Sequence, residues 1–347
     1  MLPDILLEKL AGRSLLSAED MGSEAWQKLI DFALDMKRGA VDPGRPLEGK
    51  TMSLVFFNSS LRTRSSMSVA VHQLGGYPLV LDIGGGVWGL ETRQGVVMDG
   101  DRPEHIREAI PVLARYGDYL GVRCFPGLED YAEDRLDPVL SSIRDLSPVP
   151  VLNLESSLYH PCQSLADMMT VVEKKGSLRG RRLLLSWAWH PKALPMAVPN
   201  SFAQAAALCG ADLTIAAPPE FALDPELTGR WQNLARENGG DLRLSTEADT
   251  SYDDVEVVYA KSWGSLQHYG RTEDEKACRD KYRHWIVNEE RMQRTADGIF
   301  MHCLPVRRNV VVTDGVIDSP ASVVIDEAEN RLHGQKAVLA AMAAGRN

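Results

Sequence analysis

The chain has 347 residues, of which 44% are hydrophobic and 25% charged, an ordinary composition for a globular protein. This length favours two domains over one compact core. The formal net charge of −10 argues against nucleic-acid binding, because no basic block offsets it. The longest apolar runs are strand-sized, so we expect no transmembrane helix and no membrane partner.

The first fourteen residues contain Asp4 and Glu8 and lack the basic-then-apolar order of a signal peptide. Five widely spaced cysteines form no CxxC pair, which argues against a disulfide framework and against structural zinc. We therefore expect a cytoplasmic protein that has no bound metal.

Predicted strands and helices alternate along the whole chain. Apolar residues at helical spacing from Trp26 to Met36 predict an early amphipathic helix. Predicted strands follow at residues 52–57, 78–83, 119–122 and 149–154, with helices at 60–74, about 101–116 and 161–175. After a polar turn at 176–180, strands are expected at 182–187, 212–216, 255–260 and 299–302, and a last helix at about 327–344.

This alternation predicts an α/β fold with two domains, each a parallel sheet flanked by helices. We expect residues 1–160 and the C-terminal helix 327–347 to form one domain, and residues 161–326 the other. Ligands of such folds bind at the carboxyl ends of strands, often in the cleft between domains. Polar motifs at strand ends are therefore the candidate site.

The strongest local motif is Ser60-Leu61-Arg62-Thr63, where a predicted strand passes into a helix. A helix N-terminus offers unpaired N–H groups and positive potential, and this one adds two hydroxyls and a guanidinium. The pattern indicates a phosphate site. Taken alone, it equally fits an ordinary serine-capped helix with exposed arginines.

Three further patches lie at the ends of predicted strands. Arg123 follows one strand, the His-Pro-Cys-Gln segment 160–163 opens a helix, and the His-Cys-Leu-Pro segment 302–305 follows the last strand. A single His or Cys at such a place is more often structural than catalytic. Together the four patches indicate an active site, because carboxyl ends of parallel strands meet at one edge of a sheet.

These motifs, in this order, resemble the SxRT, HPxQ and HCLP motifs of the aspartate/ornithine carbamoyltransferase superfamily over nearly the whole chain. Segments 96–101, 259–263, 302–309 and 326–331 resemble the branch that uses N-acylated ornithine. The SMG loop of the ordinary ornithine enzyme is not found, and a proline-containing loop at 190–195 stands in its region. The resemblance implies carbamoyl transfer from carbamoyl phosphate to N-succinyl-L-ornithine, or alternatively to N-acetyl-L-ornithine, in arginine biosynthesis without a cofactor.

Carried over residue by residue, the resemblance implies a carbamoyl phosphate site made of Ser60, Leu61, Arg62, Thr63, Trp88, Arg123, His160, Gln163, Cys303, Leu304 and Arg331. The expected catalytic residues are Arg123, His160, Cys303 and Thr63, in keeping with the need for fixed donors at a developing oxyanion. The acylated ornithine is expected to contact Pro103, Phe125, Glu155, His190, Lys261, Arg307, Cys303 and Leu304. Trp88 is expected to close a neighbouring subunit's site, which implies a homotrimer with shared active sites.

The choice between the two acyl groups depends on Pro103. By resemblance, the acetylornithine branch carries a glutamate at this position and the succinylornithine branch carries a proline. A glutamate would repel the succinyl carboxylate by up to ~4 kcal/mol at a separation of about 4 Å and a dielectric of about 20. We therefore expect succinyl, although Pro103 also suits the first turn of a helix that a capping box at 101–104 would open. Val311 stands where the acetylornithine type carries a lysine, which favours the same choice.

The segment 84–89 matches the GxGxxG pattern of NAD-dependent oxidoreductases. Residues 90–101 lack the helical periodicity that a dinucleotide site requires, so we expect a loop that carries Trp88. A non-catalytic relative is disfavoured by the joint presence of the motif residues. The acidic residues at 326–329, Glu327 among them, are expected to form a solvated turn and helix start.

Overall fold

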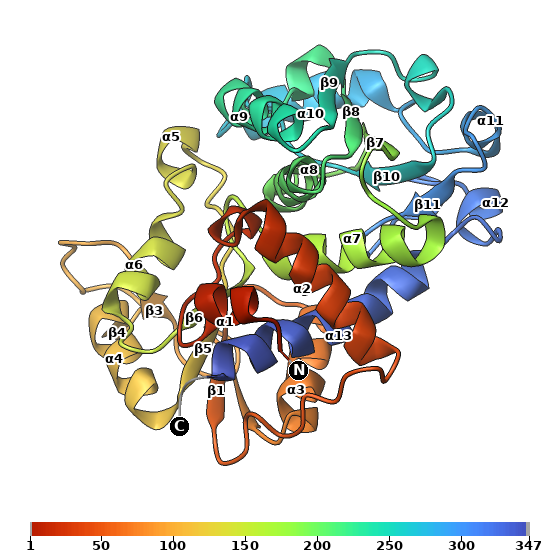
Figure 1. The fold of residues 1–347 in the computed structure, drawn as a ribbon. Coiled ribbons are helices and arrows are strands. Elements are labelled where there is room, and N and C mark those ends of the chain that lie inside the picture. Colours follow the sequence, from red (N-terminus) through yellow and green to blue (C-terminus); the bar gives the residue numbers. More distant parts are fainter. Residues whose placement is uncertain (1, 345–347) are drawn as a thin grey trace.

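The computed structural model describes residues 2–344 and contains two parallel sheets flanked by helices (Figure 1). The first sheet has the order β2-β1-β5-β6, with strands β1 (Thr51–Phe56), β2 (Tyr77–Asp82), β5 (Tyr119–Arg123) and β6 (Val151–Glu155). The second has the order β11-β10-β7-β8-β9, with β7 (Arg182–Trp187), β8 (Asp212–Ala216), β9 (Asp241–Ser245), β10 (Val257–Lys261) and β11 (Ile299–Met301). The predicted α/β fold is confirmed, and β9 is a strand that the sequence pattern did not reveal.

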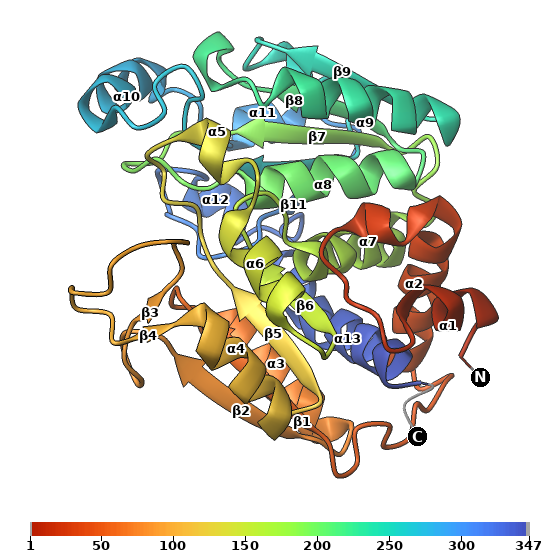
Figure 2. The ribbon, with the colours of Figure 1, turned by 90° about the vertical axis from the view of Figure 1, so that its left-hand side faces the viewer.

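Helices cover both sheets (Figure 2). They are α1 (Asp4–Leu10), α2 (Gly22–Lys37), α3 (Leu61–Gln73), α4 (Ile106–Tyr116), α5 (Tyr131–Asp134), α6 (Pro138–Leu146), α7 (Pro161–Lys175), α8 (Ala197–Leu208), α9 (Pro225–Glu237), α10 (Thr272–Arg279), α11 (Glu289–Gln293), α12 (Asp314–Ile317) and α13 (Val324–Ala343). Short 3-10 turns occur at Ala18–Asp20, Pro219–Phe221, Thr250–Tyr252 and Asp280–Tyr282. Among residues 2–344, no helix is both long and apolar enough to cross a membrane.

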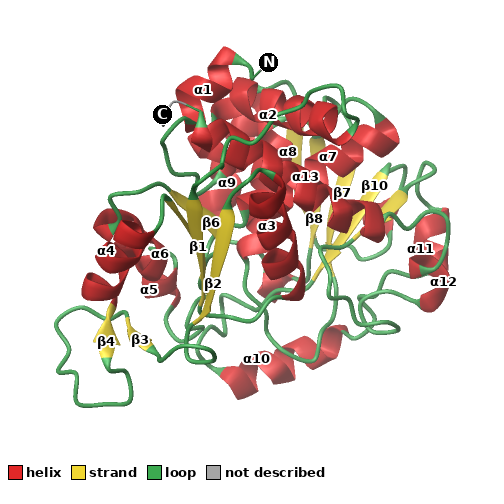
Figure 3. Ribbon diagram, turned by 90° about the horizontal axis from the view of Figure 1, so that it is seen from below, coloured by secondary structure: helices red, strands yellow, loops and turns green. Residues whose placement is uncertain are grey.

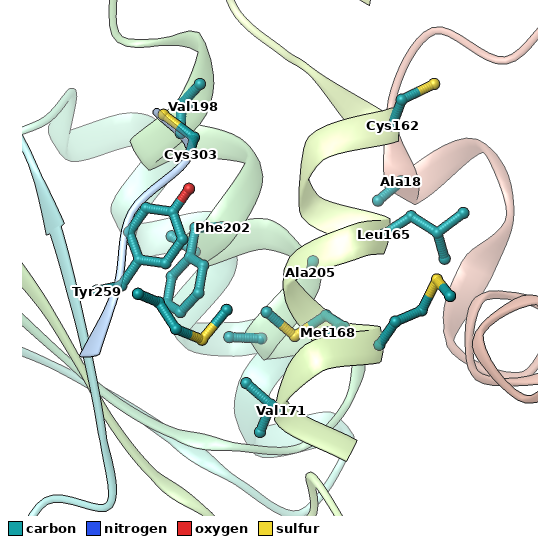
Figure 4. Packing of buried hydrophobic residues seen from close by; sticks show 14 of the residues in the cluster. Ala18, Cys162, Leu165, Met168, Val171, Val198, Phe202, Ala205, Tyr259 and Cys303 are labelled. Carbon is teal, nitrogen blue, oxygen red and sulfur yellow. The ribbon is translucent and has the colours of Figure 1, made fainter. Parts of the chain in front are cut away.

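Helices α7 and α13 connect the two sheets. Helix α7 follows β6 of the first sheet and packs on α8, which covers the second sheet, while α13 packs on α2, α3 and α7. Figure 4 shows Leu165 and Met168 of α7 in one cluster with Phe202 of α8. Gly334 of α13 lies close to Leu165, because a Cβ there would be 3.1 Å from its Cδ2. The apolar core is therefore continuous through the middle of the molecule.

The helix expected to start at the capping box 101–104 starts later. Glu104 and His105 form strand β4, which pairs in parallel with β3 (Leu90–Glu91), and α4 begins at Ile106 with His105 as its N-cap. The capping-box prediction was wrong because this pairing keeps the backbone extended. The loop between β3 and β4 projects from the body of the molecule (Figure 3).

The acidic segment at the start of α13 also differs from expectation. Glu327 is 0% exposed, Asp326 is partly buried, and Glu329 is exposed. The prediction of a solvated turn was wrong for Glu327, because α7 packs over that face of α13.

Candidate active site

A cavity of about 460 Å³ lies where the carboxyl ends of β1, β5, β6 and β10 and the segment after β11 come together. Its walls come from both sheets. The lining residues are Ser59, Ser60, Leu61, Arg62, Thr63, Arg123, Phe125, Glu155, His160, Gln163, His190, Leu194, Pro195, Val198, Lys261, Cys303, Leu304, Pro305 and Arg331. The structure therefore brings together all the predicted site residues except Trp88, Pro103 and Arg307.

The N-terminus of α3 forms one wall. Ser60 caps the helix by accepting a hydrogen bond from Thr63 N at 3.2 Å. Arg62 is half-buried, and its Nε has no partner among residues 2–344. Burial lowers the pKa of Arg62, but a guanidinium remains charged at neutral pH. The helix end therefore presents unpaired N–H groups and a cation with an unused donor to the cavity.

Arg123 and Glu155 form an ion pair beside this helix end. Both side chains are largely buried, and the Arg123 guanidinium lies 4.5 Å from the centre of the Phe125 ring. Glu155 has φ of 135°, and its N–H donates to Asn153 Oδ1 at 2.9 Å. A non-glycine residue in this region is strained, which is common where a side chain must be aimed at a ligand. The pair places one cation and one carboxylate next to each other on the cavity wall.

Arg331 holds three polar side chains around itself. Its Nη1 donates to Gln163 Oε1 at 3.0 Å, its Nη2 donates to Thr63 Oγ1, and Nη2 lies 3.4 Å from His160 Nε2. Burial, Arg331 and Arg123 together lower the pKa of His160 well below its usual range, so the imidazole is neutral at pH 7. These donors converge from α3, α7 and α13 and are suited to polarise a carbonyl oxygen.

The second sheet contributes the opposite wall. Lys261 ends β10, and Cys303 and Leu304 follow β11. Leu304 N donates to His302 Nδ1 at 2.9 Å, and this bond shapes the segment. Burial raises the pKa of Cys303, so its thiol is protonated and is not a ready nucleophile.

Three predicted site residues lie outside the cavity. Trp88 is 61% exposed, and its indole donates to Glu104 Oε2 at 2.6 Å. Pro103 is exposed at the end of the projecting loop between β3 and β4. Arg307 is exposed at the rim, where its Nε donates to His190 Nε2 at 3.0 Å.

Sequence reasoning missed several residues of the cavity and its surroundings. Leu194, Pro195 and Val198 line the cavity, but their place depends on how α8 packs. Asp167 and Glu327 lie buried behind Gln163, to which both are hydrogen-bonded. For Asp167 a signal was available, because it follows Gln163 by four residues and so shares its helix face.

The glycine segment 84–86 does not open a helix. It follows β2 and leads to the short strand β3, so the helix that a dinucleotide site requires does not begin there. Within residues 2–344, no group of three or more His, Cys, Asp or Glu side chains is arranged to hold a metal ion.

Two family models match the chain. One describes the carbamoyl-P binding domain of aspartate/ornithine carbamoyltransferase and matches residues 13–173. The other describes the Asp/Orn binding domain and matches residues 196–342.

Individual relatives agree with these models. N-acetylornithine carbamoyltransferase of Xanthomonas campestris pv. campestris is 46% identical over 335 residues, covering 95% of this chain and 97% of the relative. N-succinylornithine carbamoyltransferase of Bacteroides thetaiotaomicron is 41% identical over 284 residues, covering 81% of this chain and 84% of the relative. A crystal structure of acetylornithine transcarbamylase complexed with acetylcitrulline matches with a TM-score of 0.91 and 45% identity, covering 95% of this chain and 99% of that one.

Proposed function

Because the chain belongs to the aspartate/ornithine carbamoyltransferase family, we propose that its acceptor is N-succinyl-L-ornithine, with N-succinyl-L-citrulline and phosphate as products in arginine biosynthesis. The enzyme transfers a carbamoyl group, and N-acetyl-L-ornithine is the alternative acceptor. The observation that carries the proposal is the convergence of Arg62, Arg123 and Arg331 on one cavity beside the N-terminus of α3.

Carbamoyl phosphate fits the arrangement of this wall. The phosphate sits at the N-terminus of α3, where Ser60, Arg62 and Thr63 neutralise and hydrogen-bond it. The carbonyl oxygen of the carbamoyl group faces Arg123 and neutral His160. Since negative charge builds on that oxygen during the reaction, loss of one such donor lowers the rate by about 100- to 1,000-fold.

The acceptor amine must lose its proton to attack. An alkyl ammonium has a pKa of about 10.4, so roughly 4–5 kcal/mol oppose the neutral form at pH 7. The surrounding cations Lys261, Arg62 and Arg123 lower that pKa. The amine nitrogen bonds to the carbamoyl carbon as the carbon–oxygen bond to phosphate breaks, and the leaving phosphate accepts the amine proton.

The acceptor lies toward the second sheet. Lys261 lines that side of the cavity and Arg307 stands at its rim, so two cations face the carboxylates of an acylated amino acid. Neutral His190, which accepts from Arg307, lies between the cavity and its rim. The carboxylate of Glu155 and the ring of Phe125 complete the acceptor site.

Trp88 and Pro103 act in the site of a neighbouring subunit. Trp88 lies just before β3, and Pro103 ends the projecting loop between β3 and β4. Both are exposed, and neither lines the cavity of its own chain. A loop that serves the next subunit requires a closed ring, and the family resemblance favours a homotrimer with shared sites. The exposed apolar side chains of Val97 and Met98 on the same loop support burial against a partner.

Overall identity does not select the acyl group, since relatives of both kinds are more than 40% identical to this chain over the aligned residues. Pro103 is the residue that favours a succinyl over an acetyl group. Solved variants of N-acetyl-L-ornithine transcarbamylase in which one glutamate is replaced, by proline among others, are complexed with carbamyl phosphate and N-succinyl-L-norvaline. Pro103 places no negative charge near the succinyl carboxylate, and the neighbouring Arg102 is half-exposed with its charge only partly engaged by Glu91.

The test supplies carbamoyl phosphate with N-succinylornithine, N-acetylornithine and free ornithine in parallel. We expect the highest kcat/KM with N-succinylornithine and no turnover of free ornithine. Turnover of free ornithine alone would refute the acylornithine assignment.

Two variants test the role of Pro103. Pro103→Glu is expected to shift the preference to N-acetylornithine, because the new carboxylate repels the succinyl arm. Pro103→Ala removes the proline without adding charge and is expected to keep the succinyl preference. An unchanged preference in Pro103→Glu would contradict this account.

A further inference from the structure

A pair of buried carboxyl groups lies behind the active-site cavity. Asp167 on α7 and Glu327 on α13 are both 0% exposed, and the two helices run side by side (Figures 1 and 2). Gln163 Nε2 donates to Asp167 Oδ1 at 2.8 Å and to Glu327 Oε1 at 3.1 Å. Glu327 Oε2 accepts from His302 N at 2.9 Å. The pair therefore contacts one residue that lines the cavity and the start of the segment that carries Cys303.

The two carboxyl groups accept from the same Gln163 NH₂ and therefore lie next to each other, and Asp167 Oδ2 is buried with no hydrogen-bond partner among residues 2–344. Two neighbouring carboxylates in a buried site repel each other, which favours one proton on the pair, and the unpaired Asp167 Oδ2 is the oxygen that can carry it. Both oxygens of Glu327 already accept hydrogen bonds, from Gln163 and from His302. The arrangement therefore fits a protonated Asp167 beside an ionised Glu327.

We propose that Asp167 and Glu327 are positioning residues that share one proton and orient both the Gln163 amide and the segment after β11 for carbamoyl transfer. The inference rests on the proposed function, because it concerns the site of the carbamoyl group. Since the pair engages the NH₂ of Gln163, the amide oxygen must point to Arg331 and toward the cavity. The Gln163 oxygen can then accept a hydrogen bond from the NH₂ of the carbamoyl group. It cannot bond to the carbonyl oxygen, so it fixes which way round the carbamoyl group binds.

The environment limits the pair to one negative charge. The charged and titratable groups that face it are Arg331 on α13, Tyr259 on β10, and His302 and Cys303 on the segment after β11. Figure 4 shows the Tyr259 hydroxyl directed toward Cys303 beside α7. Arg331 is the cation of this set, and it balances one carboxylate.

Burial raises the pKa of both carboxyl groups, which favours retention of the shared proton at neutral pH. Loss of that proton at higher pH leaves two adjacent anions that repel each other. Activity is therefore expected to decline on the alkaline side as the Gln163 amide loses its fixed orientation.

Two isosteric variants separate the roles of the carboxyl groups. Asp167→Asn keeps an acceptor for Gln163 and replaces the shared proton with an amide N–H, so kcat should fall less than about 3-fold and the alkaline decline should disappear. Glu327→Gln turns one acceptor into a donor that faces His302 N or Gln163 Nε2. Leaving a buried donor unpaired in this way should lower kcat/KM for carbamoyl phosphate by about 10- to 100-fold.

Glu173→Gln is the matched control. Glu173 also bridges α7 and α13, through Lys37 and Asn330, but lies away from the cavity. Its variant should keep the wild-type pH profile. Equal losses in Asp167→Asn and Glu327→Gln, or an alkaline decline that persists in Asp167→Asn, would overturn the proposal.

A readout without substrate separates this inference from the proposed function. Difference infrared spectra of the wild type against Asp167→Asn should show the band of one protonated carboxyl group at pH 7, lost on titration to alkaline pH. Absence of that band would refute the shared proton even if carbamoyl transfer is observed. Presence of the band without turnover of any acylornithine would refute the proposed function instead. Thermal unfolding of each variant checks that the fold is intact.

Discussion

Mixing two inactive variants tests whether the active sites are shared. Trp88 is 61% exposed and absent from the cavity of its own chain, whereas Arg62 lines that cavity. Arg62→Ala removes a charged donor to phosphate, which costs about 1.5–3 kcal/mol, a loss of about 10- to 100-fold or more in kcat/KM. Trp88→Ala should be impaired independently, because it opens the neighbouring site.

The expected recovery follows from random assortment in a ring. A complete site needs the cavity of a Trp88→Ala subunit beside the loop of an Arg62→Ala subunit. In an equal mixture about one quarter of the sites meet that condition, so activity should recover to about one quarter of the wild type. The assay refolds the two variants together and measures phosphate release from carbamoyl phosphate with an acylated ornithine.

A mixture of Arg62→Ala with Arg123→Ala is the control. Both arginines line the same cavity, so no combination of these subunits restores a site and no recovery is expected. Failure of the Trp88→Ala mixture to exceed this control, with hybrid rings present by mass spectrometry, would mean that each chain has a self-contained site.

Three further outcomes are expected. Arg331→Met removes the bonds that hold the carbamoyl donors and should lower kcat by about 100-fold in steady-state assays, and a change in KM alone would contradict this. His160 has a lowered pKa in the folded state, so the unfolded state takes up a proton first as the pH is lowered. The free energy of unfolding should therefore fall from pH 7 to pH 5, by at most about 1.4 kcal/mol per pH unit. His160→Asn should reduce that slope in denaturant titrations, and an equal slope would refute the assignment. Gly121→Ala brings a Cβ to 2.9 Å from Leu154 Cδ1 and should destabilise the fold by about 1–3 kcal/mol, whereas Gly229→Ala, with nothing within 4 Å, should not destabilise it.

The alternation of strands and helices and the order of the motifs are properties of the sequence alone. Parallel strands place their carboxyl ends at one edge, so a motif that follows a strand is located without knowledge of the packing. This is why the sequence alone assigns Ser60, Arg123 and Gln163 to one site, and all three line one cavity. Strands with a continuous apolar run, such as residues 183–185 in β7, are recognised in the same way, because both faces of a parallel sheet are covered.

The tertiary structure decided the features that depend on which surfaces meet. A local pattern places Glu327 at a helix start, where acidic residues are normally solvated, but α7 covers it and makes it part of a buried pair. Pro103 suits the first turn of a helix, yet the pairing of β3 with β4 holds the chain extended there. Periodicity reports which face of an element is apolar and not which element packs against it, so burial of Glu327 and exposure of Trp88 followed only from the assembled fold.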